Sequence, residues 1–404
     1  MIWLLSFFSG AEVYCPELRG KQNLLVAAGK VVAMGSDLSL PSGLGEVRRF
    51  DLSGLKLVPG FIDQHVHMSG GGGEGGFQNR TPEVMLTHLT RAGITTAVGL
   101  LGTDATTRSI QGLLAKARGL EEEGVTTYIY TGAYEVPTRT LTESARSDLI
   151  LIDKVIGVGE VAIADHRSAH PSDQELIRLA SEARVGGMLS GKAGVLHLHV
   201  GDGPHRLSSI FHLLENTDLP VEMFVPTHLN RNQELLEDAV RLGIRGGRLD
   251  LTSVIRPTRE DRVSVKPAEA VRFLLKQGIP IEQITVSSDS NGSSPLFDEK
   301  GHLVAMDVAS PATLWEEVRD SVLETRLSLA DALRLITSNV AETLKLPRKG
   351  VVKVGADADF VVLNDRLQIE HVFAGGRVMV WHGEPVVVGT FEQKAQAPGR
   401  SKTW

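Results

Sequence analysis

Between residues 58 and 289, short apolar runs alternate with longer segments of helical periodicity. The apolar runs predict eight β-strands, over residues 58–67, 95–101, 127–134, 156–164, 195–200, 222–228, 249–255 and 284–289. Apolar residues three and four positions apart predict helices between these strands, for example over residues 83–92, 109–123, 173–185 and 268–277. Eight strands that alternate with helices predict an α/β fold of the (β/α)8 TIM-barrel type, with functional side chains on the loops after the strands.

Both ends of the chain show a different pattern, in which shorter apolar runs are broken by turn residues. Early runs cover residues 24–28, 30–34 and 48–52, and the pattern returns after two predicted helices over 311–323 and 329–344. The late runs cover residues 350–352, 359–363, 370–373, 377–381 and 385–388. We therefore predict one small β domain, formed by residues 1–57 and 345–391, which the barrel of residues 58–344 interrupts. The polar residues 392–404 predict a loose tail.

Composition limits the kind of partner. The 404 residues include 42 basic and 49 acidic side chains, a net charge of -7, and 42% hydrophobic residues. This balance provides no basic face for nucleic acid or anionic lipid, so we expect a small-molecule partner and neither nucleic acid nor membrane. The apolar first eight residues lack a basic flank and are too short to cross a membrane. The single cysteine, Cys15, excludes an intramolecular disulfide framework and a Cys-rich metal site, and we predict a cytoplasmic protein.

The first predicted barrel strand ends in two histidines, His65 and His67, separated by one residue. Alternate side chains of a strand share a face, so both imidazoles point to one place and suit a borderline-soft divalent metal. The glycine run of residues 70–76, interrupted by Glu74, allows the backbone to turn sharply beside a pocket. An isolated His-x-His motif is about as often a structural pair, with one histidine buried and the other exposed, as it is a metal site. The residues at the other strand ends are needed to distinguish these two interpretations.

Polar side chains recur near the carboxyl ends of the later strands. They are Tyr134 on the third strand, Glu160 within the fourth, His199 on the fifth, His228 on the sixth and Asp289 on the eighth. Four histidines and two carboxylates on one face can hold two metal ions and a bridging water. His197 has the strand parity of His199, and we expect it inside the barrel.

Several stretches together resemble the amidohydrolase superfamily of metal-dependent hydrolases, and within it the isoaspartyl (β-aspartyl) dipeptidases. The superfamily features are VPGFIDQHVH at 58–67, Asp289, and GADAD at 355–359. The dipeptidase features are the glycine run after His67, GLLGTD at 99–104, TGAY at 131–134, DHRSA at 165–169, PTHLNRN at 226–232, SSD at 287–289 and NGS at 291–293. These stretches span nearly the whole chain.

The resemblance implies a distorted barrel with a small β-sandwich domain, two divalent metal ions with zinc as the expected metal, and a homo-oligomer, with an octamer as a candidate assembly. It implies His65 and His67 as ligands of one metal and His199 and His228 as ligands of the other. Asp289 would bind the first metal and shuttle a proton. Residues at the positions that hold the substrate are Glu74, Thr103, Tyr134, Arg167, Arg231 and Ser293.

The implied reaction is cleavage of the β-peptide bond of a β-aspartyl dipeptide by a metal-bridged hydroxide. A metal lowers the pKa of bound water enough to give hydroxide near neutrality, and Asp289 can pass the proton to the leaving amine. The Tyr134 phenol can stabilise the oxyanion. The dipeptide carries one ammonium and two carboxylates, which Glu74, Arg167 and Arg231 match in charge and number.

The chain departs from the dipeptidase pattern on the fourth strand, where these enzymes bridge the metals with a carboxylated lysine. Glu160 occupies that place here, and one extra residue, Gly159, precedes it. Glutamate supplies the same negative charge but has a shorter reach, so we expect a local bulge at Gly159 to bring it forward. In the alternative, Glu160 faces a helix or a water and the protein holds one metal.

Two other functions remain open from the sequence. Another amidohydrolase, such as an N-acyl amino acid deacylase or a cyclic amidase, would use the same metals, but a neutral ring would leave Arg167 and Arg231 unpaired. A catalytically silent metal-binding scaffold is not expected to keep a complete set of ligands.

Overall fold

The computed structural model describes residues 5–40, 43, 45–257, 263–297 and 303–392, and within them all eight predicted barrel strands form. They are β6 (Phe61–Val66), β7 (Ile94–Gly99), β8 (Thr126–Thr131), β9 (Val155–Ile163), β10 (Val195–Val200), β11 (Phe224–Thr227), β12 (Leu249–Thr252) and β13 (Ile284–Ser287). Strands β6 to β11 form a parallel sheet in sequential order, and β12 pairs in parallel with β13.

Single backbone hydrogen bonds join these two pieces into a distorted barrel. The amide of Leu229 donates to the carbonyl of Asp250 at 3.3 Å on one side, and the amide of His67 donates to the carbonyl of Ser290 at 2.9 Å on the other. The pairing is short because His228 and Asp289, which follow β11 and β13, adopt left-handed backbone conformations with φ of 66° and 55°. The predicted barrel is confirmed. Its ring of strands is closed by only local pairing between β11 and β12 and between β13 and β6.

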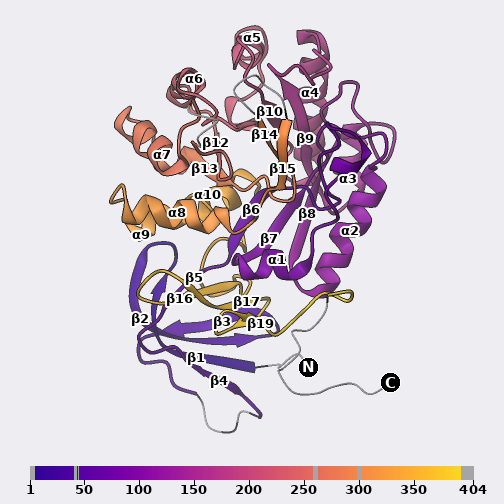
Figure 1. Cartoon of the computed structure of the whole chain (residues 1–404). Coiled ribbons are helices and arrows are strands. Elements are labelled where there is room, and N and C mark those ends of the chain that lie inside the picture. The colour runs from indigo at the N-terminus through magenta and orange to yellow at the C-terminus, as the bar shows by residue number, and fades with distance from the viewer. Residues whose placement is uncertain (1–4, 41–42, 44, 258–262, 298–302, 393–404) are drawn as a thin grey trace.

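Helices surround this sheet, as Figure 1 shows. They are α1 (Leu86–Arg91), α2 (Ile110–Glu123), α3 (Ala145–Leu151), α4 (Asp173–Ser190), α5 (Ser208–Asn216), α6 (Gln233–Ile244), α7 (Pro267–Lys276), α8 (Thr313–Leu323), α9 (Leu329–Arg334) and α10 (Ser338–Thr343), with short 3-10 turns η1 (Phe77–Asn79), η2 (Val221–Met223) and η3 (Ile281–Gln283). The side chains of Ser109, Ser172 and Asn232 cap α2, α4 and α6 by accepting from first-turn amides. The single helix predicted over 329–344 is instead two, because Thr337 between them leaves the helical conformation. None of the helices in the described residues is long and apolar enough to cross a bilayer.

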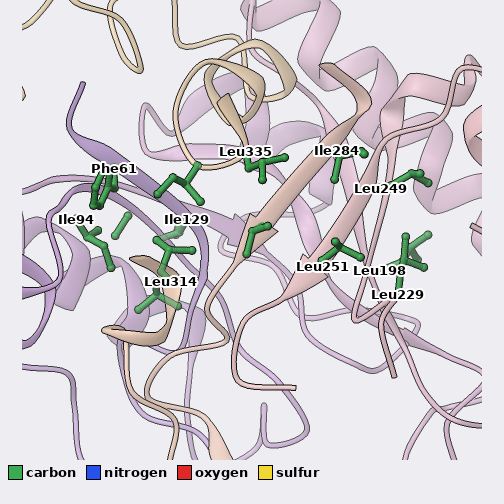
Figure 2. Close-up of a cluster of buried hydrophobic side chains, with 14 of the residues drawn as sticks. Phe61, Ile94, Ile129, Leu198, Leu229, Leu249, Leu251, Ile284, Leu314 and Leu335 are labelled. Carbon is green, nitrogen blue, oxygen red and sulfur yellow. The ribbon is translucent and has the colours of Figure 1, made fainter. Parts of the chain in front are cut away.

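The barrel core is filled by apolar side chains of the strands and of the helices around them. Figure 2 shows Phe61, Ile94 and Ile129 from β6 to β8 in one cluster with Leu251 and Ile284 from β12 and β13. Each such fully buried side chain contributes about 1.5–3 kcal/mol of stability. This packing holds the strand ends, and therefore the polar residues on them, in fixed positions.

Both ends of the chain combine in a second, mixed sheet, which lies below the barrel in Figure 1. Its described strands are β1 (Leu5–Tyr14), β2 (Leu18–Ala27), β3 (Lys30–Gly35), β4 (Arg48–Asp51), β5 (Lys56–Pro59), β16 (Phe360–Leu363), β17 (Ile369–Ala374), β18 (Arg377–Trp381) and β19 (Glu384–Pro385). The early and late halves meet where β5 pairs in parallel with β1 and antiparallel with β16. Phe8, Phe50, Phe360 and Phe373 pack together in its core. The predicted union of the two ends is confirmed, and the residue limits of the two domains stay a prediction.

Near the C-terminus, two predicted strands differ in the structure and most of the predicted tail lies outside the described residues. The strand predicted over 350–352 is wrong: Gly350 has a φ of 69°, and the carbonyl of Val352 accepts the Cys15 thiol instead of a strand partner. The strand predicted over 385–388 forms only as β19. The predicted tail lies, from residue 393 onward, outside the described residues.

A hairpin that the sequence analysis did not predict follows β13. It consists of β14 (Ser293–Phe297) and β15 (Leu303–Val308), which pair antiparallel. The hairpin begins at Ser293, one of the residues predicted to hold the substrate. It therefore extends the barrel at the end that carries the site.

Candidate metal centre and substrate pocket

Four of the predicted metal ligands meet on one side of a buried polar cluster. The Nε2 atom of His65 lies 3.3 Å from Oε2 of Glu160 and 3.4 Å from Oδ1 of Asp289. The Nε2 atom of His67 lies 3.0 Å from the same Asp289 oxygen and 4.0 Å from Oε2 of Glu160. These four side chains converge from β6, β9 and the residue two places after β13.

The other two histidines approach the opposite oxygen of Glu160. Its Oε1 atom lies 2.7 Å from Nδ1 of His199 and 3.3 Å from Nε2 of His228. Each oxygen of the Glu160 carboxylate thus faces a different pair of histidines, which is the arrangement of a bridging ligand. Among the described residues, three overlapping groups bring their ligand-type atoms within 4.8 Å of one another: His65, His67 and Glu160; His65, His228 and Asp289; and Glu160, His199 and His228.

The unpaired atoms of this cluster fit a cation. Neither Nε2 of His65 nor Oε2 of Glu160 has a hydrogen-bond partner within the described part of the chain, although both are buried and face each other. Buried polar atoms without partners are costly, and a shared cation would satisfy both. Burial opposes ionisation of Glu160, but His65, His199 and His228 hold the pKa of its carboxyl well below the ordinary value. The clusters are therefore consistent with a binuclear metal site.

The electrostatic environment of His228 also suits a ligand. Burial, with the positive charge of Arg231, lowers the pKa of His228 to about 3, so its imidazole is neutral. Its Nδ1 atom lies 2.7 Å from the hydroxyl of Thr252 on β12, which leaves Nε2 directed at Glu160. Thr252 was not singled out in the sequence, because a single threonine on a strand carries no signal of such a contact.

The expected bulge before Glu160 is present. Leu196 on β10 pairs with Val158 on β9, whereas Leu198 pairs with Val161, so β9 carries one extra residue across this interval. Gly159 is required there, since a Cβ atom would lie 2.7 Å from the carbonyl oxygen of His197. The bulge directs Glu160 into the barrel interior.

His197 lies inside the barrel, as expected, and its place is beside the cluster. It is completely buried, and its Nε2 atom lies 3.0 Å from Nδ1 of His65. Its ring stacks on that of Tyr130, with centroids 5.0 Å apart. The contact between His197 and His65 joins two strands that are not neighbours in the sheet, so no local pattern predicts it.

Three of the residues predicted to hold the substrate meet around a fourth, Glu74. Its Oε1 atom accepts from the Thr103 hydroxyl at 3.1 Å and from Nη1 of Arg167 at 3.2 Å, and its Oε2 atom accepts from the Ser293 hydroxyl at 3.4 Å. A cavity of about 240 Å³ adjoins this group, lined by Gly72, Gly73, Glu74, Phe77, Arg80, Thr103, Asp104 and Thr107. A carboxylate and a guanidinium thus stand side by side at an accessible surface.

Tyr134 and Arg231 lie nearer to the histidines. The Tyr134 hydroxyl is 2.7 Å from Nδ1 of His199, and burial, together with the charge of Glu160, raises the pKa of Tyr134 well above its ordinary value. The phenol therefore stays protonated and can donate a hydrogen bond. Arg231 is held by a hydrogen bond from Nε to the carbonyl of Val200 at 2.9 Å.

The glycine loop that carries Glu74 is fixed by contacts that the sequence did not predict. Arg108 donates to the carbonyls of Gly71 and Thr81 at 2.8 and 3.1 Å. The side-chain Nδ2 atom of Asn291 donates to the carbonyls of His67 and Pro82 at 2.9 and 2.8 Å. The bonds of Arg108 join the loop after β6 to the loop after β7, and those of Asn291 join it to the loop after β13, which begins the segment that carries Ser293.

Asp165 is a site residue that the sequence analysis did not identify. It entered only as the first residue of the stretch DHRSA, yet its Oδ2 atom lies 2.9 Å from Nε2 of His199 and 2.8 Å from Nη2 of Arg167. The signal available in the sequence was its position two residues before Arg167.

Comparison with known proteins agrees with this geometry. The sequence matches the Amidohydrolase family over residues 57–379. The chain belongs to the amidohydrolase family. This amidohydrolase is similar to the crystal structure of a β-aspartyl dipeptidase from Fervidobacterium islandicum AW-1 in complex with a β-Asp-Leu dipeptide. The identity is 41%, the match covers 95% of this chain and 98% of that chain, and the TM-score is 0.89.

Two curated relatives are less similar to this amidohydrolase than that dipeptidase. An imidazolonepropionase from Ruegeria pomeroyi is 24% identical over 85% of this chain and 88% of its own length. An adenine deaminase from Geobacillus kaustophilus is 33% identical, but the match covers 34% of this chain and 26% of that enzyme. The chain is thus a homologue of β-aspartyl dipeptidase within a family of varied hydrolases.

Proposed function

We propose that this amidohydrolase hydrolyses the isoaspartyl bond of β-aspartyl dipeptides with two divalent metal ions. The observation that carries the proposal is the ion pair of Glu74 with Arg167, placed directly beside the candidate metal centre: Nη2 of Arg167 lies 3.3 Å from Nε2 of His199. A carboxylate and a guanidinium in this position complement the ammonium and carboxylate of an aspartyl residue. The similarity to the dipeptidase solved with β-Asp-Leu supports the same substrate class.

The proposed ligands follow the two sides of the cluster. His65, His67 and Asp289 would hold one metal, His199 and His228 the other, and Glu160 would bridge them. Imidazoles with carboxylates suit zinc, which we propose as the metal. When bound, the metals would supply an activated water and polarise the scissile carbonyl.

The chain's own residues would bind and orient the dipeptide. Glu74 would accept from the α-ammonium, with Thr103 and Ser293 holding Glu74 in place, and Arg167 and Arg231 would each bind one substrate carboxylate. A hydrogen bond to a charged group of this kind contributes about 1.5–3 kcal/mol. Fixing both ends of a short substrate also limits which bond can reach the centre.

Proton transfer is proposed for Asp289 and hydrogen-bond donation for Tyr134. The Asp289 carboxylate faces both histidines of the first strand, beside the place proposed for the metal. Asp289 would take a proton from the activated water and pass it to the leaving amine. The protonated Tyr134 hydroxyl would donate to the oxygen of the carbonyl under attack, where negative charge develops.

We also propose, from the family resemblance, that the enzyme is a cytoplasmic homo-oligomer. Sedimentation of the purified protein would test the assembly. A single monomeric species at micromolar concentration would contradict the proposal.

The decisive experiment is hydrolysis of β-Asp-Leu compared with α-Asp-Leu and N-acetyl amino acids, with the metal content measured on the same sample. We expect selective hydrolysis of β-Asp-Leu by protein that holds two metals per chain. Preference for N-acetyl amino acids or cyclic amides would favour the other amidohydrolase class. Metal-loaded protein without hydrolysis of any substrate would favour a binding scaffold.

A further inference from the structure

Asp165 follows β9 and lies between a proposed metal ligand and a proposed substrate residue. It is 4% exposed, and both of its carboxylate oxygens are occupied. Oδ2 contacts Nε2 of His199 at 2.9 Å and Nη2 of Arg167 at 2.8 Å. Oδ1 accepts from Nε of Arg167 at 2.9 Å and from the Arg167 backbone amide at 2.8 Å. One buried carboxylate therefore contacts both halves of the site.

The contact with His199 favours a hydrogen on Nε2. A carboxylate paired with an arginine only accepts hydrogen bonds, so Asp165 stabilises an N–H on the nitrogen that faces it. Nδ1 lies 2.7 Å from a second carboxylate oxygen, Oε1 of Glu160, and 2.7 Å from the Tyr134 hydroxyl. With a cation between Nδ1 and Glu160, Nδ1 would offer its lone pair to the cation, and Asp165 would hold the hydrogen on Nε2. Carboxylates in this position orient metal-bound histidines and raise their basicity.

The contact with Arg167 determines which edge of the guanidinium faces the pocket. Asp165 occupies Nε and Nη2, and the remaining Nη1 atom points to Glu74 at 3.2 Å. The guanidinium also lies over the Tyr134 ring, 5.6 Å from its centroid. Arg167 is therefore held with Nη1 on the side of Glu74, where the substrate is proposed to bind.

We propose that Asp165 is a positioning residue for both halves of the site, setting the tautomer of His199 toward the metal and the orientation of Arg167 toward the substrate. The part of the proposal that concerns Arg167 and the substrate rests on the proposed function. The metal half, which concerns His199 and metal binding, can be measured without any substrate.

An asparagine at position 165 cannot satisfy both neighbours. Its amide has one oxygen that accepts and one NH2 group that donates. With the NH2 group toward Arg167, the N–H donors of the amide would face the N–H donors of the guanidinium, and no hydrogen bond could form. With the NH2 group toward His199, the amide stabilises the tautomer with hydrogen on Nδ1, which blocks the proposed metal-facing lone pair. Asp165→Asn keeps the size of the side chain, so it tests this chemistry with little change in packing.

Zinc affinity of metal-free protein, measured by competition with a chelating dye, is the first test. We expect Asp165→Asn to weaken the binding of one of two Zn²⁺ ions by about 10- to 100-fold. The matched control is Arg231→Met, which removes the other proposed substrate arginine, held by the carbonyl of Val200, and leaves the contacts of Asp165 with His199 and Arg167 in place. This variant should bind both ions within about threefold of wild type, and raise KM for β-Asp-Leu. Equal loss of metal affinity in the two variants would overturn the proposal.

Nitrogen-15 NMR of the imidazole rings in metal-free Glu160→Gln protein, which lacks the carboxylate that faces Nδ1, is the second test, with His199 assigned from the spectrum of a His199→Gln variant. We expect the hydrogen of His199 on Nε2 in this protein and a shift toward Nδ1 when Asp165→Asn is added. Hydrogen on Nδ1 in the Glu160→Gln protein would overturn the proposal, whether or not the double variant folds. If the metal and NMR results are as expected but no form hydrolyses β-Asp-Leu, the proposed function fails and the metal half of this inference stands.

Discussion

The Oδ1 atom of Asp289 lies 3.0 Å from Nε2 of His67, across 222 positions of the sequence. The same oxygen lies 3.4 Å from Nε2 of His65, so one carboxylate atom faces both histidines of the first barrel strand. This geometry suits a group that holds a metal with one oxygen and moves a proton with its carboxylate.

Replacing Asp289 by asparagine should abolish turnover and leave the fold intact, because the amide keeps the shape of the side chain but cannot take a proton. We expect kcat for β-Asp-Leu to fall by several orders of magnitude, with the melting temperature little changed. Steady-state kinetics at neutral pH and thermal unfolding would measure both. A variant that keeps more than about a tenth of wild-type kcat would contradict the assignment.

Glu74→Gln should weaken β-aspartyl dipeptide cleavage, since it removes the proposed partner of the substrate ammonium while keeping the hydroxyls of Thr103 and Ser293. Loss of about 1.5–3 kcal/mol predicts a decrease of kcat/KM by roughly ten- to a hundredfold. Glu83→Gln is the matched control, because Glu83 is 60% exposed and pairs with Lys116 on the surface. An unchanged kcat/KM for every isoaspartyl dipeptide would reject the substrate assignment and leave the metal assignment untouched.

Assembly of the site should not depend on carbon dioxide, because Glu160 already carries the carboxylate that a carboxylated lysine would supply. Lys154 cannot replace Glu160, since its Nζ atom donates to the carbonyl of Thr127 at 3.0 Å, near the start of β8. Metal-free protein would be reconstituted in carbon-dioxide-depleted and in bicarbonate-containing buffer. We expect two metals per chain and equal activity in both, and fewer metals in Glu160→Gln. One metal, or activity that needs bicarbonate, would show that Glu160 is not the bridge.

Gly159→Ala should disturb the metal centre through the backbone. The added Cβ would lie 2.7 Å from the carbonyl oxygen and 2.8 Å from the Cβ of His197, so either the bulge or His197 must move. We expect a loss of about 1–3 kcal/mol of stability, typical of overpacking, together with weaker metal binding. The control is Gly119→Ala on α2, where a Cβ meets no atom within 4 Å and a modest stabilisation is expected. Equal behaviour of the two variants would contradict the role of Gly159.

Glu317 on α8 should make stability depend on pH. Its side chain is 1% exposed, and burial raises the pKa of Glu317 from 4.5 to about 7, although Lys266 and Arg256 oppose this shift. The folded state therefore favours the protonated acid. The contribution of Glu317 to the free energy of unfolding is complete below about pH 4.5 and is lost as the pH rises through about 7. Glu317→Gln resembles the protonated acid and should remove this decrease, giving a higher melting temperature than wild type at pH 8. Calorimetry between pH 5 and 8 would measure it, and parallel curves for the two proteins would refute the prediction.

Local pattern alone determined much of this protein. Strand periodicity placed His65 and His67 on one face, and the alternation of apolar runs with helical segments predicted the barrel that brings Glu160, His228 and Asp289 to one end. These inferences succeed because the side-chain direction on a strand repeats every two residues, and because parallel barrel strands all end on the same side.

Tertiary structure decided which atoms of these residues face each other. The extra residue in β9 determines that Glu160 reaches both histidine pairs, and the left-handed backbone at His228 and Asp289 turns their side chains toward it. The contacts of Asp165 with His199 and of His197 with His65 have no periodic signature, because each joins separate parts of the chain through one particular pair of side-chain atoms. Strand parity determines the face to which a residue belongs, and only the packed barrel determines its neighbours.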